Sequence, residues 1–199
     1  MKWIGITGSI GTGKSTVSQI IREMGFEVLD ADKIALEQLK KGSSAYPQIV
    51  KLFGQEILSS DNEIDRKKLA QKVFGNHENL TKLEQIIHPL VQSDVEAKKN
   101  IFKSRGDKIA FYDVPLLFEK NLQTRFDAVL LVACDQDIQI ERIKKRNSWS
   151  DEEITKRLNS QMPLKDKIKL STHTLYNNAD LQSLKNTTID LVNKLLKTP

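Results

Sequence analysis

The chain has 199 residues, near the upper size of one domain and short for two, with 39% hydrophobic and 29% charged residues. This balance is typical of a globular protein and excludes a disordered or collagen-like chain. The 31 Lys and Arg residues against 26 Asp and Glu residues give a net charge of +5, which favours anionic partners, whether nucleic acid, acidic lipid or phosphorylated small molecules.

The N-terminal segment predicts a strand, a glycine-rich loop, a helix and a second strand. Residues 2–7 form the first predicted strand, and apolar residues at helical spacing follow until Gly25 ends the helix. Residues 26–29 form the second strand, which runs into the acidic triplet 30–32. This order of elements predicts a parallel sheet.

Between residues 33 and 104 the pattern is helical and contains no convincing strand. Apolar residues recur at helical spacing, and the polar segments 42–44 and 59–62 separate the helices. We expect an insertion beside the sheet rather than a crossover helix within it.

The sheet resumes in the second half of the chain. The sequence predicts strands over 108–113, 127–133 and, more weakly, 172–176. Basic helices are expected over about 136–145 and 151–161, and an amphipathic helix closes the chain. The predicted fold is α/β, an open parallel sheet of five strands with helices on both faces.

A single cysteine, Cys134, excludes an intramolecular disulfide and fits a reducing compartment. No apolar run approaches the length of a membrane span, and the N-terminal segment reaches its glycines too early for a secretion signal. We therefore expect a soluble, cytoplasmic protein with no membrane partner.

The loop after the first strand carries a phosphate-binding motif. Gly8-x-x-x-x-Gly13-Lys14-Ser15 matches the P-loop pattern and stands where that pattern requires, between a strand and a helix. The glycines let successive N–H groups turn toward a phosphate, and the helix directs its positive end at the same anion. Lys14 would neutralise the β- and γ-phosphates, and the Ser15 hydroxyl would hold Mg²⁺. The motif predicts a fold of the P-loop NTPase type, the alternative being a glycine-rich turn with an incidental lysine.

Two aspartates follow predicted strands, at the edge where open parallel sheets bind ligands. Asp32 could accept a proton from a substrate hydroxyl or orient it for attack on a γ-phosphate, or it could simply cap the helix beginning at Lys33. Asp113 could reach Mg²⁺ through water, or could be only a turn residue. Both pairs of alternatives remain open from the residues alone.

Arg142, Lys145 and Arg146 fall on one face of a predicted helix. They form either a solvated face or part of a lid whose cations close over transferring phosphates, and Arg157 on the next helix favours the lid. His88 could touch a substrate or be an ordinary surface or core histidine, and the three histidines have no metal-ligand spacing.

Several motifs, in this order and spacing, resemble those of the dephospho-CoA kinases, nearly from end to end. Besides the P-loop, they are Asp30-Ala31-Asp32, His88-Pro89-Leu90, Val114-Pro115-Leu116-Leu117-Phe118-Glu119, the segment from Arg142 to Asn147, and Arg157 with Gln161. The resemblance implies three parts, namely a nucleotide-binding core (about 1–32, 105–135 and 170–199), a helical substrate domain (33–104) and a lid (136–169).

The resemblance also implies phosphorylation of the ribose 3′-hydroxyl of dephospho-CoA, with ATP as donor and Mg²⁺ as cofactor, in the last step of coenzyme A synthesis. Asp32 would be the base or hydroxyl-orienting residue, and Lys14 with Arg142 would stabilise the moving phosphoryl group. The other implied site residues bind the nucleotide (Gly8, Gly11, Thr12, Gly13, Ser15, Thr16, Arg146 and Asn178) or the acceptor (His88, Leu116, Glu119 and Arg157).

The sequence departs from the family pattern in two places. Ser9 stands where a glycine is common, and Thr172 and His173 stand where carboxylates are common, near the expected adenine site.

Three other functions compete with this interpretation. The nearest is another P-loop kinase, acting on a nucleoside monophosphate or a metabolite alcohol. A GTPase-like switch would need an Asn-Lys-x-Asp or Asp-x-x-Gly motif after the P-loop, and the chain has neither. Nucleic-acid binding would be favoured by a basic patch interleaved with aromatic residues. The sequence contains no such patch, and aromatic residues make up only 6% of the chain. We expect ATP and dephospho-CoA as partners, no nucleic acid, and a monomer or a small homo-oligomer.

Overall fold

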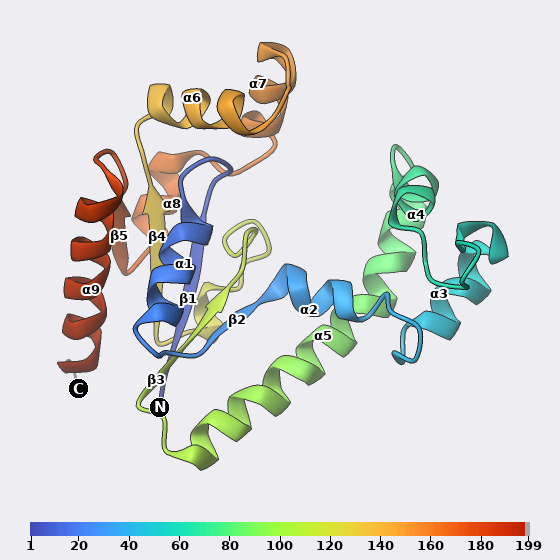
Figure 1. Ribbon diagram of the computed structural model, residues 1–199, viewed down its shortest axis with the longest axis horizontal. Helices are drawn as coiled ribbons and strands as arrows, with labels where there is room; N and C mark the ends of the chain where they lie inside the picture. The colour runs from blue at the N-terminus through green and yellow to red at the C-terminus, as the bar shows by residue number, and fades with distance from the viewer. Residues whose placement is uncertain (198–199) are drawn as a thin grey trace. The chain divides into compact units, whose positions relative to one another are not determined.

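Five parallel strands form one sheet in the computed structural model, which describes residues 1–197. The strands are β1 (Lys2–Gly8), β2 (Val28–Asp30), β3 (Ile109–Asp113), β4 (Ala128–Ala133) and β5 (His173–Tyr176). Their order across the sheet is β2-β3-β1-β4-β5 (Figure 1). β1 is central, and its Ile4 pairs in parallel register with Phe111 of β3 and Ala128 of β4. The predicted open parallel sheet is confirmed.

The chain divides into two compact units, one containing Met1–Leu29 and the chain from Phe102 onward, the other Asp30–Ile101. The helices whose residues lie in the first unit are α1 (Lys14–Glu23), α6 (Gln136–Arg146), α7 (Asp151–Asn159), α8 (Leu164–Leu170) and α9 (Leu181–Lys197), with a 3-10 turn at Gln123–Arg125. The second unit holds α2 (Ala31–Glu37), α3 (Tyr46–Phe53), α4 (Arg66–Val73) and most of α5 (His77–Arg105), with a 3-10 turn at Gln55–Ile57. No helix among the described residues is both long and apolar enough to span a membrane.

Alternation along β1 sends its side chains to opposite faces of the sheet. Ile4 and Ile6 are fully buried in a cluster that includes Ile21 of α1 and Val192 of α9, so these two helices cover the same face. This packing anchors α1, whose first residue is the lysine of the P-loop.

The opposite face of β1 supports the loop that follows β3. Trp3 stacks with Tyr112 and Phe126, with ring centroids 5.8 and 6.3 Å apart. Gly5 allows a close approach here, because a Cβ at this position would lie 2.7 Å from Leu117 Cδ1. The loop carrying the Pro-Leu-Leu motif therefore packs directly against the sheet.

The second unit has its own apolar core, which contains the fully buried Ile49 and Ile57 and the almost fully buried Leu69. Its secondary structure is mostly helical, and an isolated antiparallel bridge joins Leu58 to Ile64. α5 continues without a break through Pro89.

Candidate active site

The P-loop joins β1 to α1, as its motif predicts. Gly13 has a φ of 93° and Gly11 a φ of 81°, a region that L side chains rarely adopt. Neighbouring side chains also leave no room at these glycines. A Cβ on Gly11 would lie 2.7 Å from Ile143 Cγ1 of α6, and one on Gly13 would collide with the amide of Asn177. The path of the loop therefore requires glycine at both positions.

The N-terminus of α1 is suited to bind an anion. Among the described residues no side chain caps it, and its first turn contains no acidic residue. The first N–H groups of a helix lack intrahelical partners and carry the positive end of the helix dipole. Ser15 lies exposed in this first turn. The arrangement provides the phosphate-binding donors that the motif predicts.

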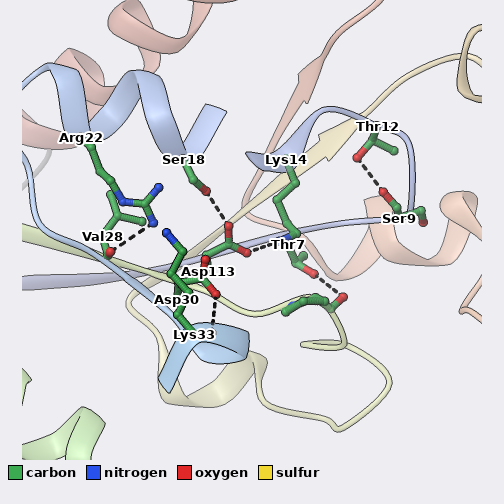
Figure 2. A network of polar contacts seen from close by, with 11 residues as sticks. Thr7, Ser9, Thr12, Lys14, Ser18, Arg22, Val28, Asp30, Lys33 and Asp113 are labelled. Carbon is green, nitrogen blue, oxygen red and sulfur yellow. Dashed lines mark hydrogen bonds and ion pairs between the residues drawn. The ribbon is translucent and has the colours of Figure 1, made fainter. Parts of the chain in front are cut away.

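Asp113, at the end of β3, contacts two side chains of α1 (Figure 2). Its Oδ1 pairs with Lys14 Nζ, and its Oδ2 accepts a hydrogen bond from Ser18 Oγ at 2.7 Å. Asp113 is only 3% exposed, so its charge requires such partners. The carboxylate therefore fixes Lys14 within the P-loop.

Arg142 of α6 is connected to the P-loop through Asn177. Its Nη1 donates to the Asn177 carbonyl at 2.9 Å and its Nη2 to Asn177 Oδ1 at 3.4 Å, while Asn177 Nδ2 donates to the Thr12 carbonyl at 2.9 Å. Sequence reasoning selected Asn178 instead, which is exposed and accepts a hydrogen bond from the Asp135 N–H at 2.9 Å. Asn177 follows β5 at the edge of the sheet used by the P-loop, and that position is the signal that could have identified it.

The other predicted cations have different surroundings. Lys145 pairs with Glu141 at 2.5 Å on the surface, and Arg146 donates from Nε to Asn147 Oδ1 at 3.0 Å. The guanidinium of Arg157 lies 4.0 Å from the centre of the Trp149 ring. Arg142 is the member of this predicted set whose hydrogen bonds lead to the P-loop.

The loop after β3 places Leu116 and Glu119 in different environments. Leu116 is 40% exposed, whereas Glu119 Oε1 accepts the Met162 N–H at 3.0 Å and pairs with Lys167 Nζ at 2.8 Å. Burial favours the neutral carboxyl of Glu119, but the Lys167 ammonium and hydrogen bonds from backbone N–H groups outweigh it and hold the pKa below its ordinary value. Thr7 Oγ1 attaches the start of this loop to β1 by donating to the Pro115 carbonyl at 3.2 Å.

Asp32 and His88 belong to the second unit. α2 begins at Ala31, and Asp30 is its N-cap, accepting the Lys33 N–H at 3.1 Å (Figure 2). The alternative interpretation of Asp32 as the cap is therefore wrong, and Asp32 is an exposed carboxylate in the first turn. His88 is also exposed, with Nε2 3.9 Å from Glu84 Oε1.

The two residues that depart from the family pattern have partners in the sheet. Thr172 donates its N–H to the Val129 carbonyl and accepts the Val129 N–H at Oγ1, both at 3.0 Å. Burial, and to a smaller extent Lys194, lowers the pKa of His173 at the start of β5. Both residues therefore contribute to the pairing or packing of this edge strand.

The sheet presents a P-loop, an aspartate at the end of β3 and an arginine from α6, the helix after β4. This combination is typical of the P-loop kinases. A shikimate kinase structure from Acinetobacter baumannii has this fold, with a TM-score of 0.55 and 14% identity over 100% of this chain and 96% of that one.

Residues 2–183 match the family model described as dephospho-CoA kinase, and the chain belongs to that family. A curated dephospho-CoA kinase of Bdellovibrio bacteriovorus is 45% identical over 92% of this chain and 91% of its own length. One from Bacillus thuringiensis is 44% identical over 92% of this chain and 91% of its own length. The predicted family and the predicted kinase class are confirmed.

Two solved structures are similar to this chain over nearly its whole length. A Thermus thermophilus protein is 32% identical with a TM-score of 0.81, covering 98% of this chain and 97% of that one. A dephospho-CoA kinase from Campylobacter jejuni is 27% identical with a TM-score of 0.75, over 98% and 97% of the two chains.

Proposed function

We propose that this chain transfers the γ-phosphate of ATP to the ribose 3′-hydroxyl of dephospho-CoA, giving coenzyme A and ADP in the cytoplasm. The observation that carries the proposal is the family match over residues 2–183, which includes both the P-loop and the helical unit. The relatives named dephospho-CoA kinase supply the identity of the acceptor.

The triphosphate binds at the P-loop in this proposal. Gly8, Gly11, Thr12 and Gly13 shape the backbone, and the N–H groups at the start of α1, including those of Ser15 and Thr16, face the phosphates. The Lys14 ammonium, held by Asp113, lies within this loop and neutralises the β- and γ-phosphates.

Two oxygen donors next to the P-loop fit Mg²⁺. The ion prefers oxygen ligands, and in nucleotide enzymes it uses one or two protein oxygens together with phosphates and waters. The exposed Ser15 hydroxyl would be a direct ligand, and Asp113 would act through water. Bound there, the ion would neutralise part of the negative charge of the phosphates.

Arg142 supplies further positive charge to the transferring group in this proposal. Its position is fixed by Asn177, which also contacts the P-loop. Preorganised cations of this kind stabilise the charge that develops during phosphoryl transfer. Two further residues complete the proposed nucleotide-binding set. Arg146 belongs to the proposed lid, which is formed by α6 to α8, and Asn178 belongs to the core segment that follows the lid.

We assign acceptor binding to the residues that the family resemblance implies. Asp32 orients the hydroxyl and accepts its proton, a task that an exposed carboxylate can perform. For the other acceptor-binding residues we propose His88 of the second unit. In the first unit we propose the exposed Leu116, the loop held by Glu119, and Arg157 stacked on Trp149.

The test is ADP release from ATP and Mg²⁺ with a panel of acceptors, namely dephospho-CoA, AMP, adenosine and no acceptor. We expect release that depends on dephospho-CoA and yields a product with the mass of coenzyme A. Turnover with AMP in the absence of any with dephospho-CoA would instead indicate a different small-molecule kinase. GTP-selective hydrolysis that needs no acceptor would indicate a nucleotide switch.

A further inference from the structure

A fully buried lysine in α8 has no place in the phosphoryl-transfer chemistry described above. Lys167 is 0% exposed, and its Nζ lies 2.8 Å from Glu119 Oε1, on a side chain that is 17% exposed. The neighbouring pair Lys169–Asp166 of the same helix is 74% and 40% exposed. Burying a charge pair carries a desolvation cost that its attraction often fails to exceed, so stability alone does not account for it.

The Glu119–Lys167 pair holds the connection between α7 and α8. Besides Lys167, Glu119 Oε1 accepts the Met162 N–H at 3.0 Å. Among the described residues, Glu119 Oε2 and Lys167 Nζ are buried without a hydrogen-bond partner, so the ion pair is the contact that holds the Lys167 ammonium. The ion pair and the Met162 N–H therefore determine where this carboxylate lies.

The same connection reaches the tip of the P-loop. Gln161, the residue before Met162, accepts the Ile10 N–H at its Oε1, at 3.3 Å. On the other side, Gln139 Nε2 of α6 donates to the Ile10 carbonyl at 2.6 Å. Both polar groups of this residue at the loop tip are thus bonded to side chains of the segment 136–169.

We infer that Glu119 and Lys167 are positioning residues for nucleotide binding. Their ion pair fixes Met162, which places Gln161 against Ile10 and so keeps the tip of the P-loop in its phosphate-binding shape. Small displacements of a binding loop weaken the interactions that depend on its geometry. The inference rests on the proposed function in one respect, namely that the P-loop binds a nucleotide. It does not depend on which acceptor is phosphorylated.

Binding of ADP with Mg²⁺, measured by calorimetry without acceptor, tests the inference. We expect Lys167→Met to weaken ADP binding by roughly five- to tenfold, with faster hydrogen exchange in peptides covering Ile10. Lys169→Met, on the exposed face of the same helix, is the matched control and should bind ADP like the parent.

Gln161→Leu separates positioning from folding, because it leaves the ion pair intact. It should weaken ADP binding as much as Lys167→Met does, with a melting temperature close to that of the parent. The double variant Lys167→Met/Gln161→Leu should bind no more weakly than either single one, since both changes break the same chain of contacts.

Two results would overturn the inference. One is ADP binding within twofold of the parent in folded Lys167→Met or in Gln161→Leu. The other concerns the Glu119→Gln/Lys167→Met variant, in which the glutamine amide oxygen can still accept the Met162 N–H and no buried carboxylate lacks its cation. This variant should recover much of the ADP affinity, so binding as weak as that of Lys167→Met alone would contradict the inference. Failure to phosphorylate dephospho-CoA would count against the proposed function and leave this test unaffected.

Discussion

The amide of Asn177 contacts both the P-loop and Arg142, and the residue is 6% exposed. Replacing it with alanine leaves the Thr12 carbonyl without its donor and removes one of the two hydrogen bonds of Arg142, while the bond to the Asn177 backbone carbonyl remains. We expect Asn177→Ala to destabilise the fold by about 1 to 3 kcal/mol, the usual cost of a buried group left unpaired. The melting temperature should fall by about 2 to 4 °C per kcal/mol, and kcat should fall as well.

Asn178→Ala is the matched control for this prediction, because Asn178 is exposed and bonds only the Asp135 N–H among its described contacts. It should cost less stability than Asn177→Ala, because no buried group loses its partner. A parent-like kcat in Asn177→Ala would show that Arg142 does not depend on the Asn177 side chain for its position.

The carboxylate of Asp32 is the proposed base. Asp32→Asn keeps its size and removes its charge, so we expect kcat to fall by about 10² or more, the range of general-base catalysis, with little change in ADP affinity. Steady-state kinetics and calorimetry measure the two effects. Asp30→Asn is the control, since asparagine caps a helix as well as aspartate does. A kcat within threefold of the parent in Asp32→Asn would exclude Asp32 as the base.

Among the elements, α5 is unusual because Pro89 lies inside it. Proline cannot donate a backbone hydrogen bond in a helix interior and crowds the preceding turn. Pro89→Ala should therefore stabilise α5 by up to about 3 kcal/mol, seen as slower hydrogen exchange of its amides. Gln92→Ala, at an exposed position of the same helix, should change little. Faster exchange in Pro89→Ala would mean that the second unit packs around the proline.

The connection between α7 and α8 should depend on pH through Glu119. Its pKa is lowered in the fold from an ordinary value of 4.5. A lowered carboxyl pKa contributes stability above the unfolded value, and this contribution is lost as pH falls through the folded value. The melting temperature of the parent should exceed that of Glu119→Gln at pH 7, and the difference should shrink below about pH 4.5. A difference that stays constant down to about pH 3 would contradict the lowered pKa.

The sequence predicts the elements that have strong apolar patterns. The strands β1, β3 and β4 appear as apolar runs because both of their faces are buried. Helix α1 appears through its helical spacing because the face toward the sheet must be apolar. α8 is not predicted, because its seven residues, LKDKIKL, contain too few apolar positions for a period to appear. Its buried lysine also resembles a surface residue until its partner Glu119 is known.

Site residues are predictable where a backbone motif defines them. The P-loop is such a case, because spacing along the chain fixes its geometry. Two other assignments depend on which of two nearby side chains meets its partner. One is whether Asn177 or Asn178 contacts the P-loop, and the other is whether Asp30 or Asp32 caps α2. Local patterns contain too little information about such contacts.

At the scale of the whole molecule, nucleotide binding should raise stability. A ligand at a concentration of about 100 times its Kd adds about 2.7 kcal/mol, which for a protein of this size corresponds to a rise in melting temperature of about 5 to 10 °C. We expect this shift for the parent with ADP and Mg²⁺, measured by calorimetry, and little shift for Lys14→Ala. An equal shift in Lys14→Ala would contradict the role assigned to the P-loop.

Transfer of a labelled γ-phosphate from ATP to dephospho-CoA tests the central claim most directly. The account predicts that label appears in coenzyme A in proportion to the ADP formed, and that omission of dephospho-CoA or the Asp32→Asn substitution reduces it strongly. ADP formation with the label recovered only as inorganic phosphate, or in an acceptor other than dephospho-CoA, would contradict it.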